Sequence, residues 1–259
     1  MLLLIGLGLD TKDISVNALE ALKKADTVLL EQYTAFIPDA YITYLKAESG
    51  KDIRIIGRSD AEENARPTLE AARVTDLAVL VPGDPLIATT HHSTLLNAAR
   101  KMGIPFRIYH APSVLSAAIG ESGLDVYKFG MIVTIAFWSK NYRPTSFLDY
   151  INKNLKNSEH SLVLLDLGAD NGKLPMSLEE AAELLRAAES EKGYGIVDDG
   201  LRLLVMGDIG RESQEIAYIS LGEVSRVSSR FGGKILTLII PSVLTFAEEE
   251  SLKKYAAGH

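Results

Sequence analysis

The first half of the chain alternates short apolar runs with segments in which apolar residues recur at helical spacing. Such runs, bounded by glycine or polar residues, are typical of buried strands. They predict strands over Leu2–Ile5, Thr27–Leu30, Ile53–Ile56, Leu77–Val81 and Phe106–Tyr109. The segments between them predict helices over Asp13–Lys24, Asp39–Lys46, Asp60–Arg73 and His92–Met102, with Asp13 as the N-cap of the first. This alternation predicts a mostly parallel sheet with helices on both faces.

The second half mixes its elements differently. Strands are predicted over Val133–Phe137, Leu162–Leu167, Leu201–Met206, Ile216–Ser220 and Ile235–Ile240. Helices are predicted over Ser146–Leu155, Ser177–Ala188 and Phe246–Tyr255, the last with acids first and lysines last, as on a solvated face. The strands after residue 200 lack the long connections that parallel neighbours need, so part of this sheet is predicted to be antiparallel. We therefore expect an α/β protein of two lobes, residues 1–112 and residues 113–259.

Composition narrows the classes of function. The 259 residues are 47% hydrophobic, enough for a substantial core, and the net charge of −7 argues against a protein that binds nucleic acid. The absence of cysteine excludes disulfides, thiolate metal sites and a cysteine nucleophile. The apolar start MLLLIGLGLD lacks the basic residues of a signal peptide, and no apolar run approaches the roughly 18 residues of a membrane span. We expect a soluble cytoplasmic protein without a metal, nucleic-acid or membrane partner.

The stretch VPGDPLIATTHH, residues 81–92, follows the apolar run Leu77–Val81. Pro82 and Pro85 fix their own φ angles, and Gly83 can adopt a positive φ without steric cost. The result is a stiff loop at the carboxyl end of a central strand, where ligands bind in open α/β sheets. The alternative is a purely structural strand-to-helix connection in which Asp84 forms the turn.

Two other glycine motifs permit competing interpretations. GLGLDT at Gly6–Thr11 is similar to a dinucleotide-binding turn, with Glu31 where a ribose-binding acid would lie, but Thr11 stands where the third glycine is needed. LLDLGADNG at Leu164–Gly172 is similar to the first motif of Rossmann-like methyltransferases, yet too little chain follows it for that fold. A tight turn between elements is the simpler explanation of each motif.

Several motifs together resemble one family. IGLGL at Ile5–Leu9 and PGDPLIATTH at Pro82–His91 resemble the tetrapyrrole-methylase-like class of S-adenosylmethionine methyltransferases. More narrowly, LLEQYTA at Leu29–Ala35 and HAPSVLSAAIGESGLDVYKFG at His110–Gly130 resemble the diphthine synthases. PTSFLDYINKNL and LPMSLEEAAELL agree with that family as well, so the resemblance spans nearly the whole chain. The region after Gly207 is less typical.

The resemblance implies a fold and an activity. The fold would be two-lobed, with a mostly parallel N-terminal sheet, a mixed C-terminal sheet and the methyl donor in the cleft between them. The activity would be methylation, to three methyls in archaeal-type members, of the amine on the 3-amino-3-carboxypropyl-histidine of translation elongation factor 2. The product is diphthine, an intermediate of diphthamide biosynthesis. S-adenosyl-L-methionine is the donor, S-adenosyl-L-homocysteine the by-product, and members are typically homodimers.

The resemblance also implies donor-binding positions on both lobes. These are Leu9, Gly83, Asp84, Ile87, Ser113, Val114, Leu165, Leu167, Met206, Ile209 and Leu236. For Leu165, Leu167, Met206 and Leu236 a plain core role is an equal alternative. Thr89 and Thr90 are further candidates to line the site.

No catalytic residue is assigned from the sequence. Methyl transfer to an amine is an in-line displacement that needs no metal and no covalent enzyme intermediate, so its main requirement is placement of the reactants. His91 and His110 are candidate bases because imidazole titrates near neutral pH, but a lone histidine at a strand end is more often structural. Tyr127 and Lys128 would either contact the protein substrate or form an ordinary surface pair.

Two other functions remain as alternatives. A corrin or porphyrin-precursor methyltransferase of the same class would need a wide basic trough for its many carboxylates, which a net charge of −7 does not favour. A non-catalytic nucleotide-binding protein is disfavoured by Thr11 in place of the third glycine.

Overall fold

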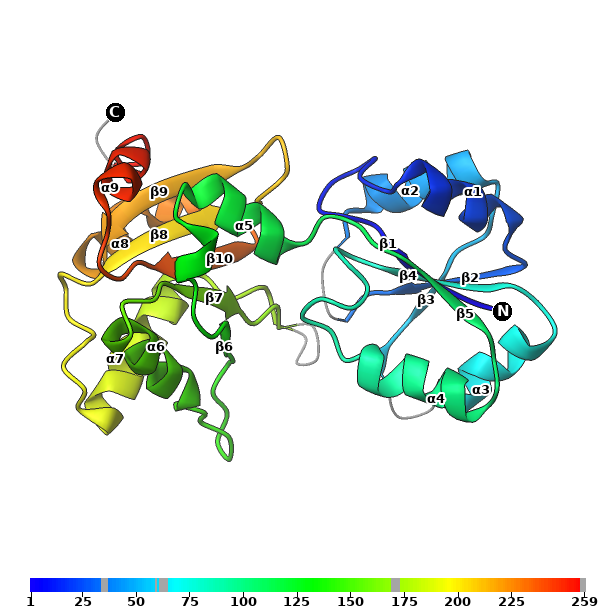
Figure 1. The fold of residues 1–259 in the computed structure, drawn as a ribbon, viewed down its shortest axis with the longest axis horizontal. Coiled ribbons are helices and arrows are strands. Elements are labelled where there is room, and N and C mark those ends of the chain that lie inside the picture. The colour runs from blue at the N-terminus through cyan, green and yellow to red at the C-terminus, as the bar shows by residue number, and fades with distance from the viewer. Residues whose placement is uncertain (34–36, 59, 61–64, 169–172, 257–259) are drawn as a thin grey trace. The chain divides into compact units, whose positions relative to one another are not determined.

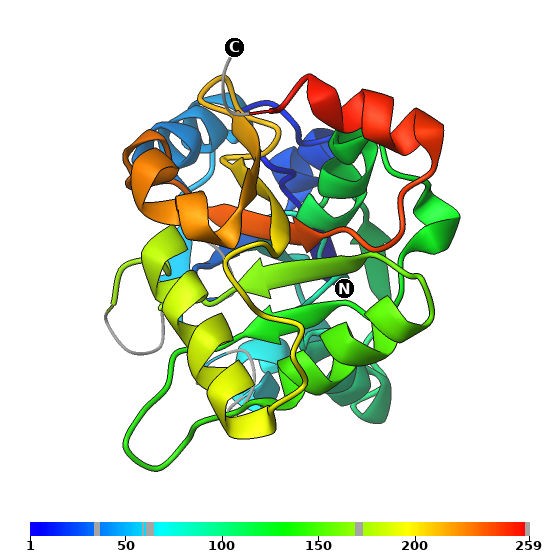
Figure 2. The same ribbon diagram turned by 90° about the vertical axis from the view of Figure 1, so that its left-hand side faces the viewer.

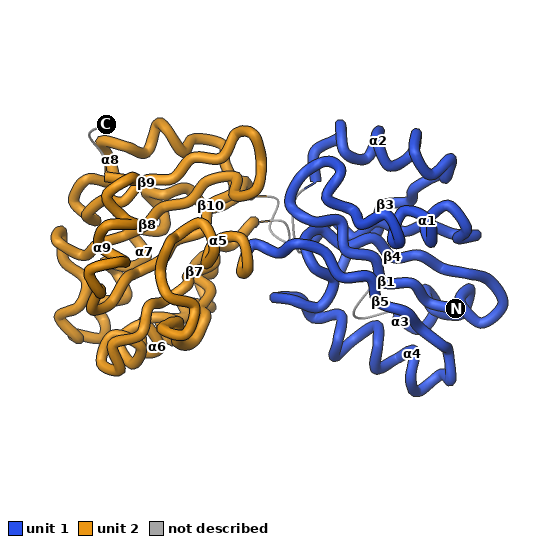
Figure 3. Tube along the Cα trace, turned by 45° about the horizontal axis from the view of Figure 1, so that its top comes forward, with its two compact units in different colours: residues 1–114 blue, residues 115–259 orange. Residues whose placement is uncertain are grey.

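The computed structural model describes residues 1–33, 37–58, 60, 65–168 and 173–256 (Figure 1). The chain divides into two compact units, Met1–Val114 and Leu115–His259, each with its own sheet and core (Figure 3). Within the described residues, no helix is both long and apolar enough to cross a lipid bilayer.

The first unit is built on a five-stranded sheet in which every neighbouring pair is parallel. Its strands are β1 (Leu2–Gly6), β2 (Thr27–Glu31), β3 (Arg54–Ile56), β4 (Leu77–Val81) and β5 (Phe106–Tyr109). They lie in the order β3-β2-β4-β1-β5. The central strands β1 and β4 are buried at every position, as expected where helices cover both faces. The predicted parallel sheet is confirmed.

Helices cover this sheet on both sides (Figure 1). One face carries α1 (Val16–Lys24) and α2 (Asp39–Ser49), and the other carries α3 (Ala65–Glu70) and α4 (Asn97–Lys101). Side chains alternate along each strand, so Ile5 packs in the core beneath α1 and α2 while Leu4 packs in the core beneath α3 and α4.

Three helical predictions in this unit need correction. Ser15, not Asp13, is the N-cap of α1, because the Asp13 carboxylate is used earlier, where it accepts the amides of Leu9 and Asp10 at 2.9 Å each. A wider, π-helical turn over His92–Leu96 precedes α4. The predicted helix Asp60–Arg73 lies partly outside the described residues, and its described part is α3 followed by a single turn over Ala71–Arg73.

The second unit contains a mixed sheet, as predicted. Its strands are β6 (Val133–Ile135), β7 (Ser161–Leu165), β8 (Arg202–Gly207), β9 (Glu215–Ser220) and β10 (Leu236–Ile240), in the order β6-β7-β10-β8-β9. Only β6 and β7 pair in parallel, and the other three pairs are antiparallel. The helices α6 (Ser146–Lys156), α7 (Leu178–Lys192) and α8 (Val224–Val227) pack on one face of this sheet.

Two more helices, α5 (Val114–Ser122) and α9 (Phe246–Lys253), lie next to each other (Figure 2, where α9 is red). The Tyr255 hydroxyl donates to the Glu121 carbonyl oxygen at 2.7 Å and joins the ends of the two helices. The helix α5 was not predicted, because its small and hydroxylated residues do not form a clear apolar stripe. The division between the units falls at the start of this helix, between Val114 and Leu115.

The charged residues of α9 were predicted to form a solvated face, but one of them, Glu248, is buried at 3% exposure. Its carboxylate pairs with the Lys128 ammonium at 2.6 Å and with Nε2 of the fully buried His160 at 3.0 Å. It also accepts the amides of Asp125 at 3.1 Å and Thr245 at 2.8 Å. The cluster of Lys128, His160 and Glu248, the anchor cluster below, therefore fastens α9 to the segment around Lys128.

The anchor cluster fixes the protonation of its members. Burial raises the pKa of Glu248, but the Lys128 ammonium, the two amides and the His160 ring outweigh it and hold that pKa well below its usual range. Burial lowers the pKa of His160, although Glu248 opposes this. His160 Nδ1 accepts the Ser242 amide at 2.9 Å, so Nε2 carries the hydrogen that faces Glu248.

Replacing Glu248 by Gln should lower the free energy of unfolding by about 2–4 kcal/mol, because Lys128 then remains partly buried without its counter-charge. Chemical denaturation at pH 7 measures this, with Glu249→Gln on the exposed side of α9 as the control. The carboxylate stabilises the fold above its unfolded pKa and loses this effect as pH falls through the lower folded value. The difference between wild type and Glu248→Gln should therefore shrink below about pH 4.5. A difference that is unchanged down to pH 3 would contradict this account.

Candidate functional site

The candidate site lies where the connections of the first sheet diverge. β1 leads through α1 toward β2, while β4 leads through α4 toward β5 on the opposite side. The helices α1 and α4 lie on opposite faces, so the loops after the adjacent strands β1 and β4 separate at the carboxyl edge of the sheet. In open α/β sheets this is the place where ligands bind.

Backbone hydrogen bonds join these two loops before they separate. The Gly8 amide donates to the Gly83 carbonyl oxygen at 3.2 Å, and the Gly83 amide donates to the Gly8 carbonyl oxygen at 2.8 Å. Both glycines have positive φ, 75° at Gly8 and 68° at Gly83, which favours glycine over residues with a Cβ. Nothing lies within 4 Å of the place where a Cβ on Gly83 would be, so the space beside this residue is open.

Gly6, at the end of β1, makes the closest approach in this region. A Cβ added there would lie 2.8 Å from the Gly83 carbonyl oxygen, 2.8 Å from Pro85 Cδ and 2.9 Å from Ala111 Cβ. The ends of β1, β4 and β5 therefore meet at one crowded point. Tyr41 supports it from α2 by donating to the Leu7 carbonyl oxygen at 2.5 Å, and burial raises the pKa of this phenol well above its usual value.

Asp84 is buried within the loop and both of its carboxylate oxygens are in use. Oδ1 accepts the Leu86 amide at 2.9 Å, which closes a turn of the kind that aspartate favours. Oδ2 lies 2.7 Å from Nδ1 of His110 and 3.3 Å from the Ala111 amide. Asp84 therefore shapes the loop and binds it to the chain that follows β5.

The other predicted donor-binding residues of this unit surround the two joined loops. Leu9 follows Gly8 and is half-buried, and Ile87 is 43% exposed in the loop after β4. Ser113 is buried and Val114 is half-buried, just beyond the end of β5. All of them follow strands at the same edge of the sheet, so the structure brings the N-terminal predicted residues together in one region.

His91 supports the loop after β4 through a buried hydrogen bond. It is fully buried, and its Nδ1 lies 3.1 Å from the Pro85 carbonyl oxygen, which can only accept, so Nδ1 carries the hydrogen. Nε2 faces the Tyr33 hydroxyl at 3.4 Å and the buried Glu31 carboxylate at 3.9 Å. Both ring nitrogens are thus turned toward protein groups, and His91 is a structural residue of the loop.

Sequence reasoning missed the pair of Glu31 and Tyr33 that supports His91. The carboxylate of Glu31 also accepts the Tyr33 amide at 2.7 Å. The sequence holds one sign of this pair, which is that Glu31 ends the apolar run of β2. An acid that is fully buried at the end of a strand needs hydrogen-bond donors nearby.

The predicted residues of the second unit gather at one end of its sheet. Leu165 ends β7 and Leu236 begins β10. Met206 is the last residue but one of β8 and pairs with Thr237 of β10. Leu165 and Leu236 belong to the core beneath α6 and α7, whereas Met206 is fully buried and lies outside that core cluster. Ile209 is buried after β8, and Leu167 is half-buried after β7.

Asp166 organises the chain between Leu165 and Leu167. Its Oδ2 accepts the Phe137 amide at 3.0 Å and its Oδ1 accepts the Gly168 amide at 2.9 Å. The carboxylate therefore ties together the ends of the parallel strands β6 and β7. Residues 169–172 of the LLDLGADNG motif lie outside the described residues. Whether the predicted residues of the second unit, from Leu165 to Leu236, contact a donor stays a prediction.

Tyr127 and Lys128 were considered for contact with the protein substrate, and of the two only Tyr127 is available. The Lys128 ammonium is committed to Glu248 and to the Val243 carbonyl oxygen at 2.7 Å. Tyr127 is 94% exposed on the adjoining turn. Thr89 donates to the Pro85 carbonyl oxygen at 2.9 Å, and Thr90 is exposed.

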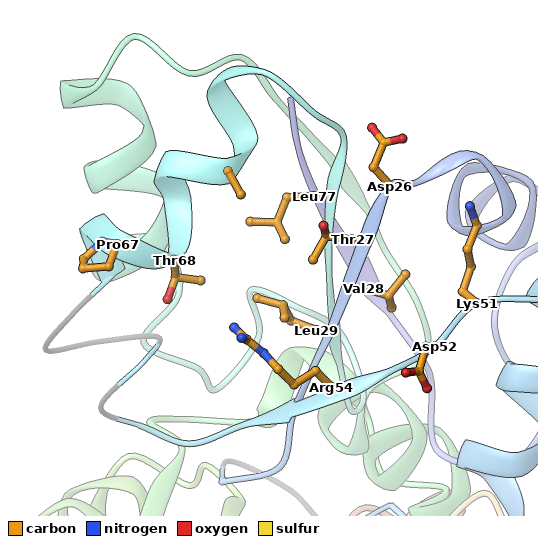
Figure 4. Close-up of a pocket in the computed structure, with 11 residues that line it drawn as sticks. Asp26, Thr27, Val28, Leu29, Lys51, Asp52, Arg54, Pro67, Thr68 and Leu77 are labelled. Carbon is orange, nitrogen blue, oxygen red and sulfur yellow. The ribbon is translucent and has the colours of Figure 1, made fainter.

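A pocket on the first unit lies apart from this site (Figure 4). It forms beside the start of β2 and β4, where Thr27 and Leu77 line it, while Lys51, Asp52 and Arg54 line it from the side of β3. These strand starts are at the opposite edge of the parallel sheet from the Gly8 and Gly83 loops. The pocket therefore does not include the predicted donor-binding residues.

Comparisons with known proteins point to one family. The family model of Tetrapyrrole (Corrin/Porphyrin) Methylases matches residues 1–225. A diphthine synthase of Methanothermobacter thermautotrophicus is 38% identical over 260 residues, covering 100% of this chain and 96% of the relative. A diphthine methyl ester synthase of Bos taurus is 36% identical, covering 93% of this chain and 89% of the relative. A crystal structure of diphthine synthase superposes with a TM-score of 0.85 at 32% identity, covering 98% of this chain and 95% of that one.

Replacing Gly6 by Ala should lower the free energy of unfolding by about 1–3 kcal/mol, because the added methyl group forces the joined loops apart. Urea denaturation measures this change. Gly57→Ala is the matched control, because nothing lies within 4 Å of a Cβ there and its φ is not positive. Equal stability of the two variants would show that the loops do not meet as closely as described.

Proposed function

The chain belongs to the tetrapyrrole methylase family and, within it, to the diphthine synthases, the methyltransferases of diphthamide biosynthesis, and from this we propose its donor, acceptor and extent of reaction. The donor is S-adenosyl-L-methionine, which leaves as S-adenosyl-L-homocysteine. The acceptor is the amine of the 3-amino-3-carboxypropyl-histidine of translation elongation factor 2. The product is diphthine, with three methyls on that amine.

The single observation that supports this most is the pair of joined loops at the divergence of β1 and β4. The space beside Gly83 is open at the ligand-binding edge of the sheet, and Ile87 exposes an apolar side chain in the same loop. A donor with both polar and apolar parts fits such a surface, on which Leu9 and Ile87 contact the apolar part.

The donor supplies an electrophilic methyl group on a sulfonium sulfur. The task of this chain is to orient that methyl group and the amine in one line, which can lower the barrier by roughly 7–11 kcal/mol in favourable cases. The fixed φ angles of Pro82 and Pro85, the Asp84 turn and the His91 support all restrict the loop in advance. A loop held in this way loses little entropy when the donor binds.

The number of methyl groups that this chain adds is the most detailed part of the proposal. Relatives named for two different products, diphthine and diphthine methyl ester, are 38% and 36% identical to this chain. We propose three methyls on the amine because the archaeal diphthine synthases match the chain over almost their full length. We also propose that the protein acts as a homodimer.

Incubation with S-adenosyl-L-methionine and elongation factor 2 that carries the aminocarboxypropyl histidine should add three methyls to that residue. Mass spectrometry of the modified peptide measures the number of methyls, and fragmentation places them on the amine or on the carboxylate. Elongation factor 2 with an unmodified histidine is the control. No mass change on the modified substrate would refute the proposed acceptor, and a fourth methyl on the carboxylate would refute the proposed extent.

Replacing Asp84 by Ala should weaken S-adenosyl-L-homocysteine binding at least about tenfold, because the Leu86 amide and the chain after β5 lose the acceptor that holds the loop. Isothermal titration calorimetry measures the dissociation constant. Asp52→Ala is the control, since that carboxylate is fully exposed beside the pocket at the other edge of the sheet. Unchanged affinity in Asp84→Ala would remove the loop after β4 from the donor site.

A further inference from the structure

Asp84 and His110 form a pair whose two members differ sharply in exposure. The Asp84 side chain is 6% exposed and the His110 side chain is 66% exposed, and Oδ2 of the one lies 2.7 Å from Nδ1 of the other. Because the ionised carboxylate can only accept, Nδ1 donates and carries the hydrogen of the neutral ring. The lone pair of the ring is then on Nε2, the nitrogen turned away from the carboxylate.

The pair lies at the edge of the sheet where the donor is proposed to bind. His110 directly follows β5, and Asp84 belongs to the loop after β4, so the two residues reach each other across the end of β1. The next residue is Ala111, whose Cβ is one of the atoms that crowd Gly6. The Ala111 amide donates to the same Asp84 carboxylate. The imidazole is therefore held beside the joined Gly8 and Gly83 loops.

The other described histidines are placed differently. Both ring nitrogens of His91 face buried protein groups. His160 is fully buried, with one nitrogen accepting the Ser242 amide and the other donating to Glu248. His92 is exposed at the start of a helical turn, and no ion pair or hydrogen bond of its side chain is found within the described residues. Among these, His110 alone combines an exposed ring with a buried carboxylate on Nδ1.

We propose that His110 is the general base of methyl transfer and that Asp84 is its positioning residue. The proposal rests on the proposed function, because it concerns an amine acceptor. An aliphatic amine is mostly protonated near neutral pH and has no lone pair to attack a methyl group. Imidazole is the side chain best suited to take up that proton in this pH range.

The step balances in atoms and charge. Nε2 of His110 removes one proton from the substrate ammonium, and the freed nitrogen lone pair forms a bond to the methyl carbon. The bond between that carbon and sulfur breaks, its electron pair stays on sulfur, and S-adenosyl-L-homocysteine results. The nitrogen is again a cation, and the imidazolium passes its proton to water. Each of the three methylations thus releases one proton, and the same base serves all three.

Asp84 contributes in two ways. Its Oδ2 fixes the tautomer that leaves Nε2 free to accept, and its negative charge stabilises the imidazolium that forms. Since the Leu86 amide holds its other oxygen, the carboxylate cannot turn away from the ring without breaking the loop turn. The orientation of the base is thereby coupled to the conformation of the donor-binding loop.

The test compares wild type with His110→Asn in single-turnover methyl transfer to the aminocarboxypropyl form of elongation factor 2, from pH 6.5 to pH 9.5. At neutral pH the variant should be slower by about 10²–10⁴-fold, the usual contribution of a general base. The difference should shrink as pH rises, because the amine then loses its proton to water unaided. S-adenosyl-L-homocysteine should bind the variant within about threefold of wild type, a difference of less than 1 kcal/mol. His92→Asn, on the same connection, should match wild type throughout.

Other outcomes would overturn the inference. A rate reduced by the same factor at every pH would mean that His110 only positions the substrate. A loss of S-adenosyl-L-homocysteine affinity that accounts for the slower rate would make it a donor-binding residue. Wild-type rates in His110→Asn would exclude any role in the chemistry. The wild-type arm separates these results from failure of the proposed function, which would show as no methyl transfer by the unaltered protein.

Discussion

The two backbone hydrogen bonds between Gly8 and Gly83 are the constraint on which the rest of the candidate site depends. They join the chain after β1 to the chain after β4 at the point where the two would otherwise separate to opposite faces of the sheet. The crowding around Gly6 brings the end of β5 to the same place. Three segments that are distant in sequence thus form one rigid edge, and this edge fixes the position of Asp84, Ile87 and His110.

The sequence predicted the parts of the structure that are set by local chemistry. Central strands such as β1 and β4 are apolar throughout, because both faces are covered, and this signal places them almost to the residue. The loop after β4 was predictable from its prolines and glycine, which limit the backbone whatever surrounds it. The helix α5 was missed because its small side chains leave no stripe that periodicity can detect, although Ala118 and Ser122 are buried.

What the sequence did not reveal are the pairings between distant residues. A turn formed by Asp84 was one of the two interpretations of its loop, and the Leu86 amide confirms it, whereas the contact with His110 was not predicted. Asp13 was expected to cap a helix, whereas it closes the turn after Gly8. Glu248 was expected to be solvated, whereas it is buried between Lys128 and His160. Each acid has the same local signature as an exposed one, and only the tertiary fold decides which donors reach it.

The anchor cluster joins residues that are far apart in the sequence, and this has a consequence for synthesis. Lys128 and His160 are made long before Glu248, so a nascent chain holds a cation and a ring nitrogen hydrogen that lack their acceptor until α9 leaves the ribosome. Burying them earlier would leave uncompensated polar groups in the second unit. The second unit therefore cannot complete its fold before α9 has been synthesised. A product that stops short of α9 would remain recognisably unfinished to the proteases that remove incomplete proteins.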